Sequence, residues 1–506
     1  MAVSVIETER KYEADLEAEL PQLGTLPGVT AVRGPDLQEL IARYYDTADL
    51  RLLRAGITLR RRTGGDDAGW HLKLPSGTDS REEIRLPAAR RGRPVPAELT
   101  GLVRARTRGA PLIPVAEVIT RRQLTTLVGR ADQSLAEVAD DRVEAVPAPD
   151  YGAPAQWREI EVELTGGDGA LLAAADRMLR DCGLRRSARS AKLERVLGEQ
   201  ARAPARPAAL APSATAGEVI GAYLRDQAET LVSLDPQVRR AKPDSVHQMR
   251  VACRRLRSAL RSFGTVVSRS QSNHLAAELR WLSGVLGDAR DAEVQAERLA
   301  AHLSQAGREE LIGPVQEQIR AHAAGARAAS MQAVAEALTS PRYDALLSEL
   351  DQIVVGRPAG PAARDRARTA LPAQVARSYR KTRRRMRAAL REPPGRSREL
   401  ALHQARKAAK QARYAAEAAA PVLGRDAARF ARQMKKLQAV LGDHQDTVVG
   451  RQLARQLGIA AQQAGQSAFS YGVLYGRDAC EGARLQAKAA RAWRKAARRR
   501  YRRWLR

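Results

Sequence analysis

The sequence predicts a two-part α+β protein, in which an antiparallel β-barrel or sandwich with a few helices precedes an all-helical region. Short β-like runs alternate with turn signals over residues 1–195. Beyond residue 217 strand signals almost disappear, and Ala, Arg, Gln, Glu and Leu recur with helical spacing. Between them, residues 201–216 are rich in Pro and Ala and have no periodicity, which is typical of a linker. We therefore expect domains at 1–200 and 217–506.

The positive charge of the chain is concentrated in the predicted helical region. The 506 residues include 86 Lys and Arg against 57 Asp and Glu, a net charge of +29. Residues 1–200 hold 30 basic and 31 acidic residues, so the whole excess lies in residues 201–506. A hydrophobic fraction of 44% excludes a wholly disordered chain, and no apolar run approaches the roughly 20 residues of a membrane span. Because no secretory signal is visible either, we expect a cytoplasmic protein.

Two halves of the helical region are similar. VHQMRVACRRLR at 246–257 matches LHQARKAAKQAR at 402–413, and VLGDARDAEV at 285–294 matches VLGDHQDTVV at 440–449. A Gly- and Pro-containing break at 356–372 separates the halves, so we predict repeats at about 217–355 and 370–500. This period is too long for a solenoid, and we expect two helical bundles related by a pseudo-two-fold axis.

Charged residues alternate along the predicted strands of the first domain. A strand places alternate side chains on one face. The spacing recurs at Glu7, Glu9 and Lys11, at Arg60 and Arg62, at His71 and Lys73, at Arg81 and Glu83, and at Glu159, Glu161 and Glu163. In a single strand such alternation ordinarily means a solvated face. Its recurrence in several strands instead predicts a wet interior for a highly charged anion and a divalent cation, because Mg²⁺ takes oxygen ligands while Arg and Lys bind phosphoryl oxygens.

These strands resemble the CYTH family, the triphosphate tunnel metalloenzymes. The family's ExExK motif is present as Glu7, Glu9 and Lys11. It is followed in order by Tyr45-Asp46-Thr47, Leu59-Arg60-Arg61-Arg62, Leu72-Lys73-Leu74, Arg81-Glu82-Glu83, Arg121, Asp140, Glu159-Ile160-Glu161-Val162-Glu163 and Lys192. The resemblance covers roughly residues 1–200. It implies an eight-stranded antiparallel barrel whose tunnel binds a triphosphate and hydrolyses it with Mg²⁺ or Mn²⁺.

The resemblance also implies roles for individual residues. The catalytic residues are Glu7, Glu9 and Lys11. The metal ligands are Glu7, Glu9, Asp140, Glu159 and Glu161. The triphosphate-binding residues are Lys11, Arg60, Arg62, Lys73, Arg81, Arg121 and Lys192. Two of these assignments fall in runs, Arg60-Arg61-Arg62 and Arg121-Arg122. The member that faces the tunnel depends there on the strand register, which a bulge shifts by one residue.

Two helices of the second domain carry matching stripes of cations. At 100° per residue, His247, Arg250, Arg254 and Arg257 lie within about 80° of one another, and His403, Arg406, Lys410 and Arg413 repeat the pattern. A solvated Arg-rich face with an incidental histidine is the plain alternative. Few acidic residues stand at i+3 or i+4, however, so the cations repel one another unless an anion covers them. Metal ligation by these histidines lacks a second ligand at i+4, where Val251 and Lys407 stand.

The paired stripes resemble the CHAD family, which is associated with binding inorganic polyphosphate, over about residues 217–500. The resemblance implies that His247, Arg250, Arg254, Arg257, His403, Arg406, Lys410 and Arg413 bind polyphosphate. The LGD segments at 286–288 and 441–443 belong to the pattern too, and we expect the following acids Asp291 and Asp446 to orient the basic helices. Polyphosphate carries no bases to read, so a cationic track without stacking platforms suits it.

Other polyanions fit the composition less well. Aromatic residues make up only 4% of the chain, which argues against single-stranded nucleic acid because its binders commonly stack bases. Basic runs at 377–387 and 491–506 could extend the polyanion surface or hold nucleic acid, and the second could also lie on an acidic membrane or be a solvated tail.

The preferred interpretation is a metal-dependent inorganic triphosphatase with a polyphosphate-binding helical domain, cytoplasmic and associated with polyphosphate granules. One alternative is a non-catalytic sensor of triphosphate or polyphosphate. Another keeps the barrel as an enzyme on organic triphosphates, either a thiamine triphosphatase or an adenylate cyclase. A third is nucleic-acid binding by the basic half.

Overall fold

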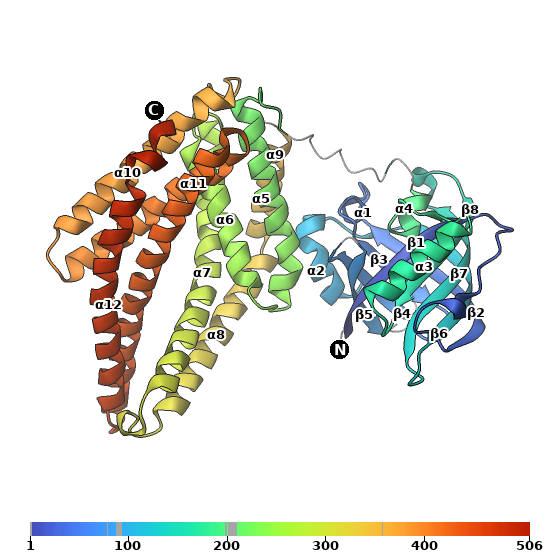
Figure 1. Cartoon of the computed structure of the whole chain (residues 1–506), viewed down its shortest axis with the longest axis horizontal. Helices are drawn as coiled ribbons and strands as arrows, with labels where there is room; N and C mark the ends of the chain where they lie inside the picture. The colour runs from blue at the N-terminus through green and yellow to red at the C-terminus, as the bar shows by residue number, and fades with distance from the viewer. Residues whose placement is uncertain are drawn as a thin grey trace. The chain divides into compact units, whose positions relative to one another are not determined.

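The computed structural model describes residues 3–77, 79–87, 94–197, 200, 210–356 and 358–505. The chain separates into two compact units, residues 1–206 and 207–506. In the described residues the named strands belong to the first unit, whereas the second is helical (Figure 1). Residues 201–209 of the predicted linker lie outside the described residues.

The first unit is a closed antiparallel barrel of eight strands. They are β1 (Val3–Ala14), β2 (Ala31–Asp46), β3 (Thr58–Thr63), β4 (Gly69–Pro75), β5 (Ser80–Pro87), β6 (Ile113–Val128), β7 (Ser134–Pro147) and β8 (Ala155–Leu164). Neighbours pair in the order β5-β4-β3-β2-β6-β7-β8-β1, and β1 also pairs with β5, which closes the barrel. A two-residue strand, β9 (Arg185–Arg186), adds to β1. The predicted eight-stranded antiparallel barrel is confirmed.

The barrel is apolar on the parts of its outer surface that helices cover and charged inside. On β1, Tyr12 is fully buried in an outer cluster with Ile160 and Val162 of β8, whereas Glu9 and Lys11 line the interior. Helix α3 (Gly169–Asp181) covers this outer cluster with an amphipathic face. Because the hydrophobic core lies between barrel and helices, the strands' inward faces remain available for charged side chains.

Three more helices complete this covering. Helices α1 (Arg51–Arg54) and α2 (Ala97–Thr107) contribute to an apolar cluster around Trp70, on the β3 to β5 side. Helix α4 (Lys192–Val196) packs through Leu193 and Val196 into a cluster that contains Trp157. The packing of α4 places the first residue of this helix, Lys192, at the barrel cavity.

The second unit contains eight described α-helices. They are α5 (Ala216–Arg239), α6 (Ser245–Ser262), α7 (Arg269–Gln305), α8 (Val315–Thr339), α9 (Pro341–Val355), α10 (Ala367–Arg391), α11 (Arg396–Gln463) and α12 (Phe469–Ala496). The break predicted at 356–372 is shorter in the structure, because α10 begins at Ala367. No helix among the described residues is both long and apolar enough to cross a bilayer.

The two sequence repeats fold into corresponding helices. Helix α11 contains one non-helical residue, Gly424, with φ 67° and ψ −146°, which divides it into two segments. The first segment carries the 402–413 match to α6 and the second carries the 440–449 match to α7. Helices α5 and α8 then correspond in chain order to α10 and α12. A glycine suits the dividing position because a side chain would be strained at this φ and ψ.

Candidate functional site

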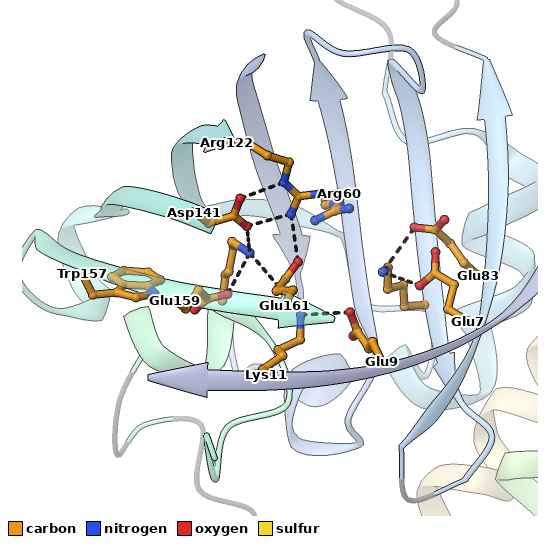
Figure 2. A network of polar contacts seen from close by, with 12 residues as sticks. Glu7, Glu9, Lys11, Arg60, Glu83, Arg122, Asp141, Trp157, Glu159 and Glu161 are labelled. Carbon is orange, nitrogen blue, oxygen red and sulfur yellow. Dashed lines mark hydrogen bonds and ion pairs between the residues drawn. The ribbon is translucent and has the colours of Figure 1, made fainter. Parts of the chain in front are cut away.

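The barrel encloses a cavity of about 460 Å³. Figure 2 shows charged side chains from several strands pointing toward one another inside the barrel. The residues expected from the sequence that line this cavity are Glu7, Glu9, Lys11, Arg60, Arg62, Lys73, Arg81, Glu161 and Lys192. The lining also includes Asp66, Asp67, Glu83, Arg85, Arg122, Glu137 and Glu163. The alternating charges therefore face a shared enclosed space rather than bulk water.

Lys192 organises one part of the lining. Its Nζ lies 2.8 Å from a carboxylate oxygen of each of Asp141, Glu159 and Glu161. Arg122 donates two hydrogen bonds of 2.7 Å to Asp141 and one of 2.8 Å to Glu161. Burial opposes ionisation of Glu161, but the adjacent Lys11, Lys192 and Arg122 hold its pKa well below the ordinary value. These carboxylates are thus already paired with cations (Figure 2).

A second ion-pair group lies around Glu7. Lys73 and Arg85 both pair with the Glu7 carboxylate, and the Arg85 distance is 2.9 Å. The same two cations also contact Glu83. Burial nevertheless raises the pKa of Glu7, and the proximity of Glu83 adds to the increase.

Three carboxylates stand side by side on three neighbouring strands, and few cations balance their negative charge. Glu163 of β8 stands opposite Glu9 of β1 on one side and opposite Glu137 of β7 on the other. Glu9 has an ion pair with Lys11 at 3.2 Å. In the described part of the chain, no ion pair is found for Glu163 or Glu137. Burial, Glu7 and then Glu9 raise the pKa of Glu163 to about 7, and like charges on adjacent strands are destabilising. Within the described residues, Glu163 and Glu137 therefore lack a counter-cation, whereas Glu9 has Lys11.

The carboxylates of the cavity fit a hard divalent cation. Oxygens of Asp141, Glu159 and Glu161 all lie within 4.8 Å of one another, which is a geometry that could hold a metal ion. Lys192, however, occupies the space between these three carboxylates. Glu163, by contrast, lines the cavity and has no ion pair among the described residues. Carboxylate oxygens are the ligands that Mg²⁺ and Mn²⁺ take in proteins.

Two residues expected at the tunnel lie on the outside of the barrel, so these expectations were wrong by one position. Arg121 has a side chain 67% exposed and pairs with Glu144 at 3.3 Å. Asp140 accepts two hydrogen bonds of 2.8 Å from Arg158, which also donates to backbone carbonyls of residues 15, 16 and 18. Because successive strand residues face opposite sides, their neighbours Arg122 and Asp141 point inward instead.

Glu159 is placed differently from Glu161. Its side chain is buried and accepts a hydrogen bond from the Trp157 indole at 2.6 Å, in addition to its contact with Lys192. Glu159 does not line the cavity directly, so it orients Lys192 rather than facing the open space.

Some lining residues were given no role from the sequence: Glu163 was identified only as part of the alternating charge, and Arg85 and Glu137 were not named. Glu163 follows Glu161 and Arg85 follows Glu83 at the spacing of two that shares a strand face, and both line the cavity. Glu137 precedes the inward-facing Asp141 by two such steps. No sequence signal separated Arg122 from Arg121, because both neighbours are arginines.

The predicted cationic stripes of the helical unit meet at one place. Arg250 and Arg254 of α6 approach Arg406 and Lys410 of α11, and these four residues are called the cation cluster. Burial and the nearby Arg254, Arg406 and Arg250 lower the pKa of Lys410 to about 5. Burial also lowers the pKa of Arg254 to about 10, with contributions from Arg250 and Arg406. Burial first, and then the neighbouring cations, thus disfavour the charged form of these side chains.

An acid and two glycines position the arginines of the cluster. Arg250 donates a hydrogen bond of 2.9 Å to Asp291. A methyl group on Gly287 would lie 3.1 Å from the Arg250 guanidinium, and one on Gly442 would lie 3.5 Å from that of Arg406. The glycine of each LGD segment therefore provides the room in which one arginine lies across the neighbouring helix. The buried Nε atoms of both arginines have no hydrogen-bond acceptor among the described residues.

The other four expected polyphosphate residues surround the cluster. His403 has its Nδ1 2.6 Å from the amide oxygen of Gln445. Burial and neighbouring cations lower the pKa of both His403 and His247. Arg257 lies close to Arg261 and Arg280, which together with burial lower its pKa. Arg413 differs from these residues because it forms an ion pair of 2.6 Å with Glu417.

Comparisons with known proteins agree with this architecture. A CYTH domain model matches residues 5–189, and a CHAD domain model matches residues 222–455. The uncharacterized proteins MT2285 and Rv2226, from two strains of Mycobacterium tuberculosis, are each 37% identical to this chain over 508 residues. Each match covers 96% of this chain and 95% of the relative.

Solved structures also show similarity to parts of the chain. PptA from Streptomyces chartreusis matches with a TM-score of 0.48 and 19% identity, over 56% of this chain and 100% of that chain. The CHAD domain from the plant Ricinus communis matches with a TM-score of 0.44 and 26% identity, over 56% of this chain and 93% of that chain.

Proposed function

Because the chain belongs to the family that joins a CYTH domain to a CHAD domain, we propose that its barrel hydrolyses inorganic triphosphate with a divalent cation. We propose further that its helical unit binds polyphosphate at the cation cluster. The observation that carries the first proposal is the enclosed cavity, in which cations and carboxylates line the same space.

The ion pairs of the cavity suit an exchange of partners when a triphosphate enters. Lys11, Lys73 and Arg122 are held by carboxylates within the cavity. Phosphoryl oxygens would take these cations, and the carboxylates they release would be left uncompensated. A divalent cation bound by such carboxylates supplies the missing positive charge and neutralises charge on the phosphate. Anion and metal should therefore bind more tightly together than either does alone.

The chain's own residues would bind and orient the substrate. Arg60, Arg62 and Arg81 line the cavity, and Tyr44, at 3.3 Å, is the nearest hydrogen-bond partner of Arg60. Burial and the proximity of Arg60 lower the pKa of Arg62 to about 9, so an anion between them would relieve their repulsion. With the phosphate chain held in place, attack by water in line with the leaving phosphate needs positioning and charge neutralisation rather than a covalent intermediate.

The lining favours an inorganic over an organic triphosphate. Among the described lining residues, Tyr44 is the only aromatic one, and its hydroxyl already accepts a hydrogen bond from Arg60. A nucleobase or a thiazole ring would ordinarily be gripped by an aromatic face. We therefore place tripolyphosphate ahead of ATP and thiamine triphosphate as a substrate.

The test is phosphate release measured side by side from tripolyphosphate, long-chain polyphosphate, ATP and thiamine triphosphate, with Mg²⁺ or Mn²⁺. We expect the fastest release from tripolyphosphate. Glu7→Gln and Glu9→Gln should each lower this rate by about 100-fold or more, which is typical of removing a charged group from a transition state. Glu144→Gln, an exposed β7 carboxylate outside the barrel, is the matched control and should leave the rate unchanged.

Two results would overturn the proposal. Purified protein could release no phosphate from tripolyphosphate with either metal, which would leave a binding or sensing role. Alternatively, ATP or thiamine triphosphate could be hydrolysed faster, which would assign the barrel to organic triphosphates.

A further inference from the structure

A second cationic surface lies on α10. This helix contains nine basic residues and no acidic residue. Exposed arginines recur along it at intervals of three and four residues and therefore share one face: Arg377, Arg380, Arg384, Arg387 and Arg391. In the described part of the chain, no carboxylate pairs with a basic side chain of α10. Like charges at such spacings destabilise a helix unless an anion compensates them.

Aromatic packing holds another basic segment beside α10. The segment 498–505 contains Arg498, Arg499, Arg500, Arg502 and Arg503 and no acidic residue. Its Trp504 packs edge-on against Phe430 with ring centroids 5.9 Å apart, and Phe430 packs against Tyr379 of α10 at 5.8 Å. Figure 1 shows this end of the chain beside α10. Arg502 thereby lies near Arg383 and Arg387, around the ring of Tyr379.

These aromatic rings are already used in packing. Trp493 is only 7% exposed and stacks on Tyr379 with ring centroids 6.1 Å apart. The Trp504 indole donates a hydrogen bond of 3.1 Å to the Tyr501 carbonyl. Rings held in this way cannot insert into a membrane interface or stack on successive bases. The surface therefore offers charge without the features that a membrane or single-stranded nucleic acid would use.

The surface is continuous with the cation cluster. At the spacing of three and four residues that shares a helix face, Arg254 is followed on α6 by Arg257 and Arg261, and Arg257 lies near both Arg254 and Arg261. Arg261 in turn lies near Lys381 of α10, which is also close to other arginines of that helix. Hydrogen bonds of 3.3 Å from Lys381 to Gln411, and from Gln411 to Ser262, join the three helices at this point. Cations therefore follow one another from the cluster onto α10.

We propose that a long polyphosphate chain held at the cation cluster continues over Arg257, Arg261 and Lys381 onto the exposed arginines of α10 and the segment 498–505. This inference rests on the proposed polyphosphate binding and adds a preference for long chains. A linear polyphosphate matches an extended cationic track because it carries charge at every unit along its length. A short oligophosphate would occupy the cluster alone.

The test uses the full chain with four substitutions on α10: Arg380→Gln, Arg383→Gln, Arg384→Gln and Arg387→Gln. The matched control removes four exposed cations from α8, α11 and α12: Arg320→Gln, Arg327→Gln, Arg455→Gln and Lys488→Gln. The dissociation constants of long-chain polyphosphate and of tripolyphosphate are measured at several salt concentrations. Thermal unfolding checks that each variant is folded.

We expect the α10 variant to bind long-chain polyphosphate at least about tenfold more weakly and with a shallower salt dependence, because fewer phosphates are neutralised. Its affinity for tripolyphosphate should be unchanged, and the control should stay within twofold of the original protein. Equal losses in the α10 variant and the control would reduce the effect to net charge and overturn the inference, as would an unchanged long-chain affinity.

If the original protein binds no polyphosphate at all, the proposed function itself fails. Two further measurements distinguish a polyphosphate track from a surface for a different polyanion. Duplex DNA and vesicles of phosphatidylserine and phosphatidylcholine are measured at equal salt. If the α10 variant loses affinity for either of these but keeps its affinity for long-chain polyphosphate, the surface belongs to that other partner and the inference is wrong.

Discussion

Two adjacent arginines on β6 have opposite surroundings and allow a direct comparison. Arg122 is inside the barrel and holds Asp141, a fully buried carboxylate, with two hydrogen bonds of 2.7 Å. Arg121 is outside, with a side chain 67% exposed. Substitution of each arginine in turn therefore compares an interior position of the barrel with the exterior position next to it in the sequence.

Arg122→Gln should lower phosphate release from tripolyphosphate by about 100-fold, because it removes a cation from the cavity. It should also lower the free energy of unfolding by about 2 to 3 kcal/mol, since one partner of a buried ion pair is lost while Lys192 remains. Arg121→Gln should leave the rate unchanged and the stability within about 0.5 kcal/mol. Steady-state kinetics and chemical denaturation measure both effects. Equal loss of activity in the two variants would contradict the strand register that places Arg122 inside the barrel and Arg121 outside it.

Lys410 is a buried amine surrounded by other cations. Arg250 and Arg254 approach it from α6, Arg406 from its own helix, and Asp446 from the second segment of α11. Burial and these arginines lower its pKa to about 5, from an ordinary 10.5. Between these values the folded protein holds fewer protons than the unfolded chain, so the contribution of Lys410 to stability improves as the pH rises.

Binding of polyphosphate at neutral pH should therefore cause Lys410 to take up a proton from solution. Binding should take up protons, and its affinity should fall as the pH rises from about 6 to about 9, because the charged amine is harder to form. His247 and His403 also lie near the cluster with lowered pKa values, so an anion could protonate them too, and a variant of Lys410 is needed to separate its proton from theirs. Calorimetric titrations in two buffers with different ionisation enthalpies measure the uptake directly.

Lys410→Met should remove this proton uptake, whereas Lys407→Met, an exposed lysine on the same helix, should leave it unchanged. The interpretation fails if the original protein takes up no proton, or if Lys410→Met takes up as many as before.

At the scale of a single helix, the glycines of α7 have different neighbours. A methyl group on Gly287 would approach the Arg250 guanidinium at 3.1 Å, whereas one on Gly284 would meet nothing within 4 Å. Replacing either by alanine should favour the helix by up to about 1 kcal/mol. Gly287→Ala should in addition displace Arg250 and weaken polyphosphate binding several-fold.

Binding assays and thermal unfolding on Gly287→Ala and Gly284→Ala separate the two effects. Gly284→Ala should bind polyphosphate normally. A normal affinity in Gly287→Ala would mean that the LGD glycine does not position the arginine.

Regular patterns predicted the elements well, because they depend on spacing within one segment. The period-two charge of Glu7, Glu9 and Lys11 predicted a charged inner face, and the helical stripe from His247 to Arg257 predicted a cationic one. Strand alternation alone could not choose between Asp140 and Asp141. That choice depends on which residue of β7 faces the cavity, and both candidates are aspartates. Nothing in the local spacing indicated that Arg158 would hold Asp140 on the outside.

Contacts between distant segments lay beyond such patterns. Lys192 reaches three carboxylates from β7 and β8 only because α4 packs beside Trp157. The meeting of Arg254 with Arg406 likewise depends on the packing of α6 against α11. Side-chain pairs of this kind depend on tertiary packing, which local periodicity does not contain.

At the scale of the whole molecule, we assign separate chemistry to the two compact units. Glu9→Gln should lower phosphate release by about 100-fold or more while leaving the affinity for long-chain polyphosphate unchanged. Arg254→Gln combined with Arg406→Gln should have the opposite effect, with tripolyphosphate hydrolysis at saturating substrate preserved. Phosphate release and equilibrium binding on the same three proteins provide the measurement. Loss of both properties in either variant would contradict this division.

If the proposed function is right, the barrel interior holds a triphosphate and a divalent cation together. A crystal structure of the full chain with a non-hydrolysable imido analogue of triphosphate and Mn²⁺, with the anomalous signal of manganese recorded, tests this directly. We predict phosphate density against Arg60, Arg62 and Arg122, and an anomalous peak at the carboxylates that include Glu9. Phosphate density confined to the outer surface, with no peak inside the barrel, would contradict the proposal.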